Sequence, residues 1–325
     1  MEIISAYATD VRRAVRALTR QPGFAAVVLL TLALGIGANT AIFSLIYGIL
    51  LRPFPYAEPD RLVKIESVYA RTTGSVQGAS QLDLDDWRRH TSSFDKIGLH
   101  ITFPAILNTG GGPSQSVRLT FVTADMLDAL GLGPIIGRLF TPEEDIVGGD
   151  VLKAVLSHGL WQTTFGGDRN VVGRVIRVRG ATYTVIGVMP PGFGFPERSE
   201  IWVPLQARYA GYKDAFWKSR DFRVHKAIAR LTSGVTVAQA QSEMNTLAAQ
   251  LEREFPATNQ GLQLRLTPLR DAEVGDVRPY LWLLLGAVVM VLLSASMWPI
   301  CCWRVVRRGG ASWRFARRWV PSAGS

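Results

Sequence analysis

Residues 24–51, FAAVVLLTLALGIGANTAIFSLIYGILL, contain no charged side chain, and neither do residues 280–302, YLWLLLGAVVMVLLSASMWPICC. At about 1.5 Å of rise per residue, the first run forms a helix of roughly 40 Å, which exceeds the roughly 30 Å of hydrocarbon in a bilayer. The second run is shorter but still reaches about the length of a full span. We therefore expect transmembrane α-helices at 23–51 and 279–303, which flank a central region at 52–278.

The arginines outside these two runs predict the orientation of the chain. Four arginines precede the first run within residues 1–22, and six follow the second run within residues 304–325. Because Lys and Arg are enriched in cytoplasmic flanks, we expect both ends to be cytoplasmic and the central region to be extracytoplasmic.

The formal net charge of +10 comes mainly from these flanks. The first 22 residues contribute +2, because Glu2 and Asp10 offset two of the four arginines, and the tail contributes +6, which leaves +2 for everything between. Such a distribution anchors a chain to a membrane and offers no basic patch on a folded face. We therefore expect membrane lipid as a partner and no nucleic acid.

A secretory signal peptide is the competing explanation of the first run, because basic residues precede apolar ones. Its hydrophobic segment would be far too long for that class. Apolar side chains continue to Leu51, well past any cleavage point near Ala38 to Ala41.

The first run also has a face on which a second helix could pack. Ala33, Gly37 and Ala41 recur every four residues, and Asn39 and Ser44 add hydrogen-bonding groups at membrane depth. These five residues form our candidate helix-packing face. The alternative is that small residues are simply common in transmembrane helices. Neither run contains Asp, Glu, Lys, Arg or His, so the usual marks of a proton relay or a substrate pathway are missing.

The central region mixes strand and helix patterns in an irregular order, which predicts an α+β domain rather than a doubly wound sheet. A capping box at Thr236 and Gln239 predicts a helix that ends before Pro256, while Ser80 and Thr123 are interpreted as caps of two shorter helices. Strand patterns occur at 62–67, 117–122, 151–157, 175–178, 182–189, 201–205, 226–231 and 262–269. Turn-forming residues at 110–113 and 190–196 indicate two lobes, the second at roughly 130–212. Residues 143–145 resemble the first turn of a helix.

Motifs for catalysis or cofactor binding are scarce. No G-x-x-x-x-G-K-[ST] pattern occurs, so any ATP-driven step needs a separate protein. Ser157-His158 lacks the first Gly of a nucleophile elbow, and the four histidines lack ligand spacing, so we expect no enzyme, no cofactor and no metal site. Asp83, Asp85 and Asp86 are neighbours on one predicted helix and are interpreted as a solvated, self-paired surface.

Several stretches resemble the MacB/FtsX-type permeases of ABC transporters, in particular the acidobacterial duplicated orphan permease group. Residues 32–44, LALGIGANTAIFS, and 50–56, LLRPFPY, resemble the first membrane helix of these permeases and the segment after it. Residues 139–145, LFTPEED, 156–161, LSHGLW, 165–168, FGGD, and 183–193, YTVIGVMPPGF, resemble the MacB-like periplasmic core domain. The resemblance extends from about Asp10 to about Leu293.

The resemblance implies a permease subunit in the bacterial cytoplasmic (inner) membrane, which couples a separate cytoplasmic ATPase to a conformational change of the external domain for efflux or mechanotransmission. The implied partners are the ABC-type ATPase, further permease helices or a second copy, and an envelope protein. A membrane-tethered extracytoplasmic binding or scaffold protein without ATPase coupling is the alternative.

The last stretch departs from the family pattern. Similar permeases continue with a cytoplasmic segment and further helices, whereas residues 294–325 change composition abruptly, with four Trp among Arg and Gly. We hypothesise that a frameshift or truncation replaced the family sequence after about Leu293, so that the tail at 304–325 is frameshifted and the chain is a truncated copy.

Overall fold

The computed structural model describes residues 56–69, 76–110, 113–210 and 218–274, together with single positions between 23 and 44 and between 283 and 290. The chain divides into two compact units. One is Pro53–Glu273, which we call the central domain, and the other comprises Met1–Arg52 with Val274–Ser325.

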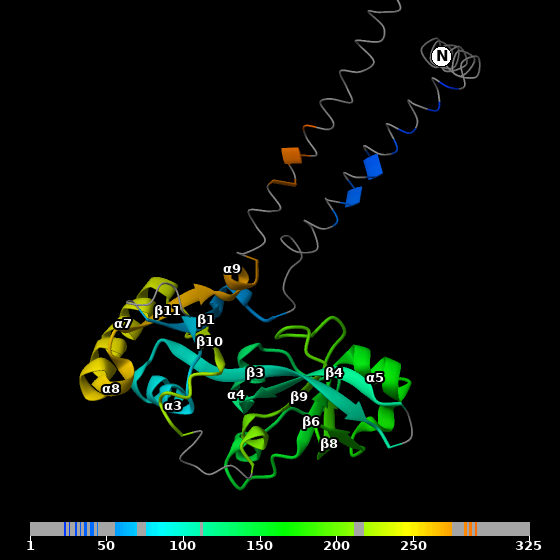
Figure 1. Ribbon diagram of the computed structural model, residues 1–325, viewed down its shortest axis with the longest axis horizontal. Coiled ribbons are helices and arrows are strands. Elements are labelled where there is room, and N and C mark those ends of the chain that lie inside the picture. The colour runs from blue at the N-terminus through cyan, green and yellow to red at the C-terminus, as the bar shows by residue number, and fades with distance from the viewer. Residues whose placement is uncertain are drawn as a thin grey trace, which may run out of the picture. The chain divides into compact units, whose positions relative to one another are not determined.

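One mixed sheet of eleven strands forms the central domain (Figure 1). Its order is β11-β1-β10-β3-β4-β9-β6-β8-β5, with β2 beside β1, and β7 beside both β3 and β8. Pairing is parallel between β4 and β9 and between β6 and β8, and the other pairs are antiparallel. The strands are β1 (Leu62–Tyr69), β2 (Val76–Gln77), β3 (Phe94–Asn108), β4 (Gln115–Val122), β5 (Ile136–Gly137), β6 (Lys153–Leu156), β7 (Val175–Val178), β8 (Ala181–Val188), β9 (Ile201–Pro204), β10 (Lys226–Leu231) and β11 (Leu262–Pro268).

Helices connect the strands and cover the sheet, and the α+β class expected from the sequence is confirmed for this domain. Figure 1 shows α3, α7 and α8 at one end of the domain and α5 at the other. The α-helices are α3 (Gln81–His90), α4 (Ala124–Ala129), α5 (His158–Phe165), α7 (Val237–Glu254), α8 (Pro256–Asn259) and α9 (Leu269–Val274). Single 3-10 turns are η2 (Pro59–Arg61), η3 (Pro142–Asp145), η4 (Arg169–Val171) and η5 (Leu205–Arg208).

The longest strand, β3, has 15 residues and belongs to both ends of the sheet. Its first half, up to His100, pairs with β10, and its second half pairs with β4. Leu107 and Asn108 also pair with β7, which closes a ring of strands in the order β3-β4-β9-β6-β8-β7. A single strand therefore joins the open, helix-covered part of the sheet to the closed ring.

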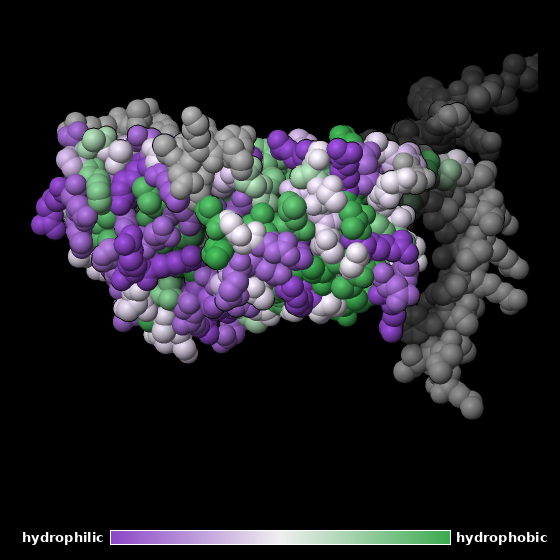
Figure 2. Space-filling model, turned by 90° about the horizontal axis from the view of Figure 1, so that it is seen from below, coloured by the Kyte–Doolittle hydropathy of each residue, from purple (hydrophilic) through white to green (hydrophobic). Residues whose placement is uncertain are grey.

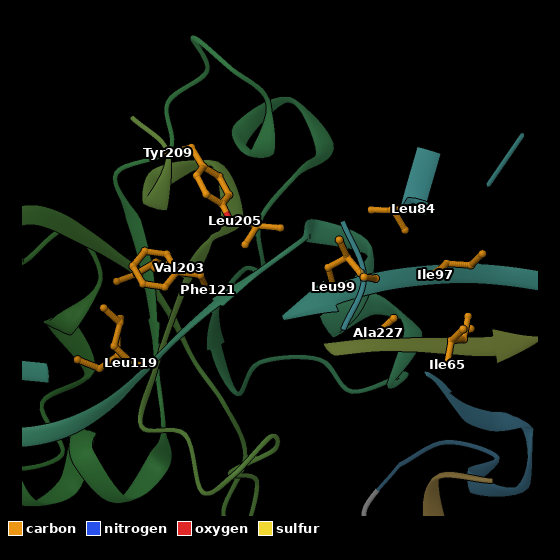
Figure 3. Close-up of a cluster of buried hydrophobic side chains, with 14 of the residues drawn as sticks. Ile65, Leu84, Ile97, Leu99, Leu119, Phe121, Val203, Leu205, Tyr209 and Ala227 are labelled. Carbon is orange, nitrogen blue, oxygen red and sulfur yellow. The ribbon is translucent and has the colours of Figure 1, made fainter. Parts of the chain in front are cut away.

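Alternate residues along the strands enter two hydrophobic clusters on opposite faces of the sheet. The larger cluster extends from α3 and α7 into the interior of the ring, and Figure 3 shows its members Ile65, Leu99 and Phe121. The smaller cluster lies on the other face and includes Met126 of α4 and Trp202 of β9. Because the two faces alternate so regularly, the strand patterns were readable from the sequence.

Most of the predicted elements are confirmed. Each of the eight predicted strands overlaps an observed one, and α7 begins at the capping box in which Gln239 N donates to Thr236 Oγ1 at 3.3 Å. Ser80 caps α3 in the same way, because Asp83 N donates to its hydroxyl at 3.1 Å. Pro256 ends α7 as expected but also begins the short helix α8.

Thr123 is the N-cap residue of α4, as predicted, but its side chain makes no capping hydrogen bond. Its hydroxyl accepts from Leu99 N of β3 at 3.0 Å. The first N–H of α4, that of Ala124, donates instead to Asp145 Oδ2 at 3.1 Å. Residues 143–145 lie in a helical turn, as predicted, but that turn is the single 3-10 turn η3 and not part of an α-helix.

The edge strand β11 is covered by a side chain. Gln241 of α7 donates to the Leu264 carbonyl at 2.7 Å and accepts from Leu266 N at 2.8 Å. Its amide thus replaces a neighbouring strand at an edge that would otherwise offer free backbone groups.

Exposed apolar side chains of the central domain lie mostly on the ring and its loops. Figure 2 shows hydrophobic patches between polar side chains on the face that it views. The large exposed apolar residues of this part are Ile106, Ile135, Ile146, Val147, Leu152, Val172 and Val175.

The two predicted membrane spans lie almost wholly outside the described residues. The single positions that the structure describes there are helical, and Leu30, Ile36, Leu283 and Met290 among them are exposed. In the described part of the chain, no helix combines the length and apolar character needed to cross a bilayer.

Candidate functional site

One end of the central domain packs on an aromatic loop, residues 190–196 between β8 and β9, and the other end shares a hydrophobic cluster with that loop. Tyr56, at the start of the domain, packs edge-on against Phe193 and Phe195 of this loop, with ring centroids 6.5 Å and 5.7 Å apart. Leu269, which begins α9 at the other end, belongs to the same hydrophobic cluster. We call this region (residues 56–61, 190–196 and 269–273) the junction.

Trp202 and Ser199, which follow the aromatic loop in the chain, contact it through hydrogen bonds and ring packing. Trp202 Nε1 donates to the Phe195 carbonyl at 2.9 Å, and the Phe193 ring centroid lies 5.1 Å from that of Trp202. Ser199 N donates to the Gly194 carbonyl at 2.6 Å. Because Phe193 and Phe195 are no more than 7% exposed, the loop is part of the core rather than a surface turn.

Charged groups gather where the chain leaves the domain. Partial desolvation of its carboxyl group raises the pKa of Glu273. The charges of Lys64 and Lys226 act in the opposite direction, and that of Glu197 raises the pKa further. Lys226 forms an ion pair with Glu197, the residue that follows the aromatic loop. The pKa of Tyr56 is raised by burial and then by the charge of Glu273. Tyr56 and Glu273, near the two ends of the domain, therefore interact electrostatically.

Two arginines fix the first turn of the domain to the sheet. Arg230 of β10 donates through Nε to the Ala129 carbonyl at 2.6 Å and through Nη2 to the Ala57 carbonyl at 2.7 Å. Arg61 donates through Nε to the Leu231 carbonyl at 2.9 Å. The chain near Ala57 is thus connected through Arg230 to β10 and to α4.

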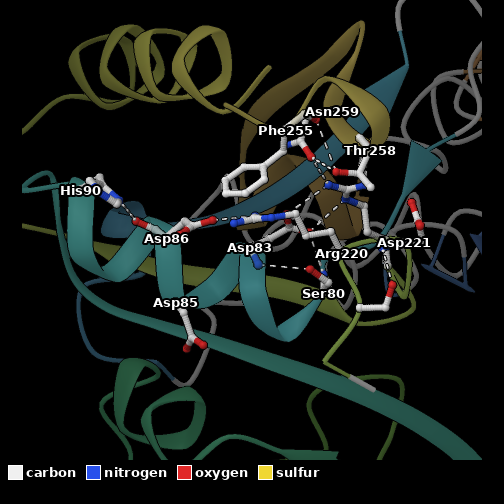
Figure 4. A network of polar contacts seen from close by, with 12 residues as sticks. Ser80, Asp83, Asp85, Asp86, His90, Arg220, Asp221, Phe255, Thr258 and Asn259 are labelled. Carbon is white, nitrogen blue, oxygen red and sulfur yellow. Dashed lines mark hydrogen bonds and ion pairs between the residues drawn. The ribbon is translucent and has the colours of Figure 1, made fainter. Parts of the chain in front are cut away.

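A buried ion-pair network ties α3 to α8 (Figure 4). Arg223 Nε lies 3.0 Å from Asp83 Oδ2, and both side chains are only 2% exposed. The same guanidinium donates to the Thr258 carbonyl and to Asn259 Oδ1, each at 3.0 Å. The guanidinium of Arg223 is thus paired with a carboxylate and hydrogen-bonded to α8 in the interior of the domain.

The acidic cluster on α3 is therefore not the solvated surface that the sequence indicated. Asp86, like Asp83, is buried, and its Oδ2 lies 2.6 Å from Arg220 Nη1. Arg220 also stacks over the Phe255 ring at 3.7 Å. Asp85 points away from this network in Figure 4. The self-pairing part of the prediction is confirmed only for Arg89 and Asp86, 3.0 Å apart. The partners Arg220 and Arg223 are far along the chain, so helical spacing could not reveal them.

Two buried histidines lie near the centre of the domain. His225 Nδ1 is 2.9 Å from the Ala79 carbonyl, so it carries the proton, and Nε2 accepts from the Tyr209 hydroxyl. Burial lowers the pKa of His225 to about 4, and burial together with Lys226 lowers that of His100 to about 3. Both are therefore neutral at neutral pH. His225 acts as a hydrogen-bonding group, and His100 packs edge-on against Phe195.

The predicted helix-packing face stays a prediction. Ala33, Gly37, Ala41 and Ser44 are described as helical, and Asn39 lies outside the described residues. The hydroxyl of Ser44 donates to the carbonyl of Thr40 in the same helix at 2.7 Å. The junction was not singled out from the sequence, because Tyr56 and Phe195 are 139 positions apart. The only available signal was the Pro- and Phe-rich turn at 190–196.

Comparison with protein families gives one match over most of the chain. Residues 25–247 match the model of the MacB-like periplasmic core domain. No curated protein sequence matches the chain.

Solved structures with a similar fold share 14–16% sequence identity with the chain. At this level of identity the similarity concerns the fold alone. A domain of a permease protein from Porphyromonas gingivalis has a TM-score of 0.50 at 14% identity, covering 66% of this chain and 92% of that one. The periplasmic region of MacB from Actinobacillus actinomycetemcomitans has a TM-score of 0.49 at 15% identity, covering 73% and 98%. The extracellular domain of the noncanonic ABC-type transporter YknZ from Gram-positive bacteria has a TM-score of 0.47 at 16% identity, covering 62% and 99%.

Proposed function

The chain belongs to the family of MacB-like periplasmic core domains, and we propose that it is a permease component that couples a separate ATPase to conformational change of this domain. The result of the coupling is efflux or mechanotransmission. The junction is the observation that carries the proposal. Tyr56 and Leu269, next to the two ends of the domain, enter one hydrophobic cluster with the aromatic loop of the ring.

Membrane placement is the second part of the proposal. We propose spans at 23–51 and 279–303, with both termini in the cytoplasm of a bacterial cell and the central domain outside the inner membrane. Uncharged runs of this length and arginine-rich flanks support the assignment. Exposed apolar side chains such as Leu30 and Leu283, at 69% and 72%, also suit a lipid environment.

The partners follow from the placement. A separate ABC-type ATPase supplies the energy, because the sequence carries no P-loop motif of its own. Further permease helices, or a second copy of this chain, pack on the face formed by Ala33, Gly37, Asn39, Ala41 and Ser44. The hypothesis that the chain is a truncated copy stays a prediction. Sequencing the coding DNA past the stop codon tests it.

Co-purification and a labelling assay test the coupling. A tagged full chain in mild detergent is expected to recover an ATPase. A reporter cysteine at Val175, which is 59% exposed on β7, is then expected to change its labelling rate when ATP is added. The Tyr56→Ala exchange should keep the ATPase bound but abolish the ATP-dependent change, because it removes the contact with Phe193 and Phe195.

The matched control is Tyr56→Phe, which keeps the ring and should keep the response. Recovery of no ATPase from repeated preparations would remove the basis of the coupling proposal and favour the tethered binding protein. An unchanged response in the Tyr56→Ala variant would instead show that the junction is not the route of coupling.

A further inference from the structure

The sheet has an opening along one edge of β3. His100 pairs with Lys226 of β10, and Leu107 pairs with Val178 of β7. Between them, residues 101–106 have ladder partners only in β4 among the described residues, apart from one hydrogen bond from Arg179 N to the Ile106 carbonyl. We call this stretch the window. It spans roughly 20 Å of extended strand.

The backbone groups at the window can be assigned from strand alternation. Arg179 N donates to the Ile106 carbonyl at 3.4 Å from the β7 side, so that carbonyl faces away from β4. Residues two apart share a direction, so the N–H and carbonyl of Thr102 and the carbonyl of Pro104 also face the window. Pro104 has no N–H to lose, which explains how proline is tolerated inside this long strand.

The side chains at the window are partly accessible. Pro104 is exposed, Ile106 is 50% exposed, and Phe103 is half-buried. The window is thus a strand edge that water reaches, unlike the edge of β11, which Gln241 covers.

Two arginines converge on Phe103 at the window. The guanidinium carbon of Arg208 lies 4.4 Å from the ring centroid, and that of Arg179 lies 5.3 Å away. No carboxylate in the described ranges forms an ion pair with either of them. The Nε of Arg208 is buried without a hydrogen-bond partner in the described part of the domain, and the rest of its guanidinium also lies beside Tyr209. Two such cations beside a free strand edge are complementary to an anionic, extended ligand.

We propose that the window is a docking site for an extended acidic segment of a partner protein, which adds to β3 as a further strand. Its backbone would pair with Thr102 and Pro104, and its carboxylates would pair with Arg179 and Arg208. The site does not depend on ATPase coupling. Binding is measured on the chain alone, so this inference and the proposed function fail separately.

Three labelled ten-residue peptides test the proposal with the full chain in mild detergent. One alternates Val with Asp, one alternates Val with Lys, and the third is the acidic peptide with alternate backbone nitrogens methylated. Fluorescence anisotropy is expected to show that the acidic peptide binds about tenfold more tightly than the lysine peptide. The methylated peptide should bind about tenfold more weakly than its parent, because it cannot form the ladder.

Variants locate the site. Arg179 has a φ of 50°, so Arg179→Gly removes the side chain while relieving backbone strain, and the variant should fold at least as stably as the parent. It is expected to weaken the acidic peptide about three- to fivefold. The control Arg169→Ala removes an exposed arginine before the other end of β7 and should change binding less than twofold.

Three results would overturn the proposal. Equal binding of the methylated and unmethylated acidic peptides would reduce the site to a simple anion site. Full competition by millimolar glycerol phosphate would favour a lipid headgroup or free phosphate. Equal losses in Arg179→Gly and Arg169→Ala would mean that the peptide responds only to overall charge.

Discussion

Asp83 and Arg223 form an ion pair inside the domain, with Oδ2 and Nε 3.0 Å apart and both side chains 2% exposed. The pair joins the start of α3 to the segment before β10, and through Asn259 it reaches α8. Removing one charge of such a pair leaves the other buried without compensation.

The Asp83→Asn exchange is therefore expected to lower the free energy of unfolding by about 3 kcal/mol. The measurement is denaturant unfolding in mild detergent, followed by tryptophan fluorescence. Asp85→Asn on the same helix is the control, because Asp85 points away from the network, and it should change stability by less than about 0.5 kcal/mol. Equal effects of the two exchanges would contradict a stabilising role for the buried pair.

The Gln241→Ala exchange should expose the edge of β11. It removes two hydrogen bonds to the backbone of Leu264 and Leu266, at about 1 kcal/mol each, so a loss of about 2 kcal/mol is expected. The freed edge should also increase aggregation, which light scattering detects. Gln250→Ala, at an exposed position of α7, is the matched control and should do neither.

Stability should fall in mild acid because of the buried histidines. The folded-state pKa of His225, about 4, lies below its ordinary value of 6.5, so the unfolded chain binds a proton at this residue before the folded chain does. The contribution of neutral His225 to the free energy of unfolding is therefore complete above pH 6.5 and is lost as the pH falls towards 4. His225 alone is expected to account for about 2 kcal/mol between pH 7 and pH 5. Asp145 acts in the opposite direction, because burial raises its pKa to about 6.

The test is the difference in unfolding free energy between pH 7 and pH 5, measured for the parent chain and for His225→Gln. The contribution of Asp145 is common to both and cancels. A parent and a variant with the same pH dependence would show that His225 does not remain neutral in the folded state.

The Gly98→Ala exchange should separate α4 from β3. A Cβ at residue 98 would lie 2.4 Å from Met126 Cα, so the backbone of one element must move. We expect a loss of about 2–3 kcal/mol in unfolding free energy. Gly159→Ala in α5 is the control, since its Cβ would meet no atom within 4 Å, and it should be neutral or stabilising by up to about 1 kcal/mol.

The elements that follow one local rule were predictable from the sequence. The capping box of Thr236 and Gln239 located the start of α7, and alternation located β1, β7 and β10. β3 was missed because Gly98 and Pro104 each weaken a strand pattern. Their reasons are tertiary, since Gly98 is required by the approach of α4 and Pro104 faces an unpaired edge.

The junction and the buried ion pairs could not be predicted from the sequence, because in both cases the partners are far apart along the chain. Asp83 forms a local hydrogen bond to Ser80 N, which was predictable, but its charge partner is 140 positions away. Tyr56 likewise meets Phe195 only in the folded domain. Without those contacts, a cluster of carboxylates on a helix indicates a solvated surface.

The shared strand β3 limits how the domain can change shape. One uninterrupted strand pairs both with the helix-covered part of the sheet and with the ring. The two parts are therefore unable to slide past each other or swing apart while these strand pairings stay intact. The movement left to them is a rotation of one part relative to the other about the axis of this strand, which twists the strand.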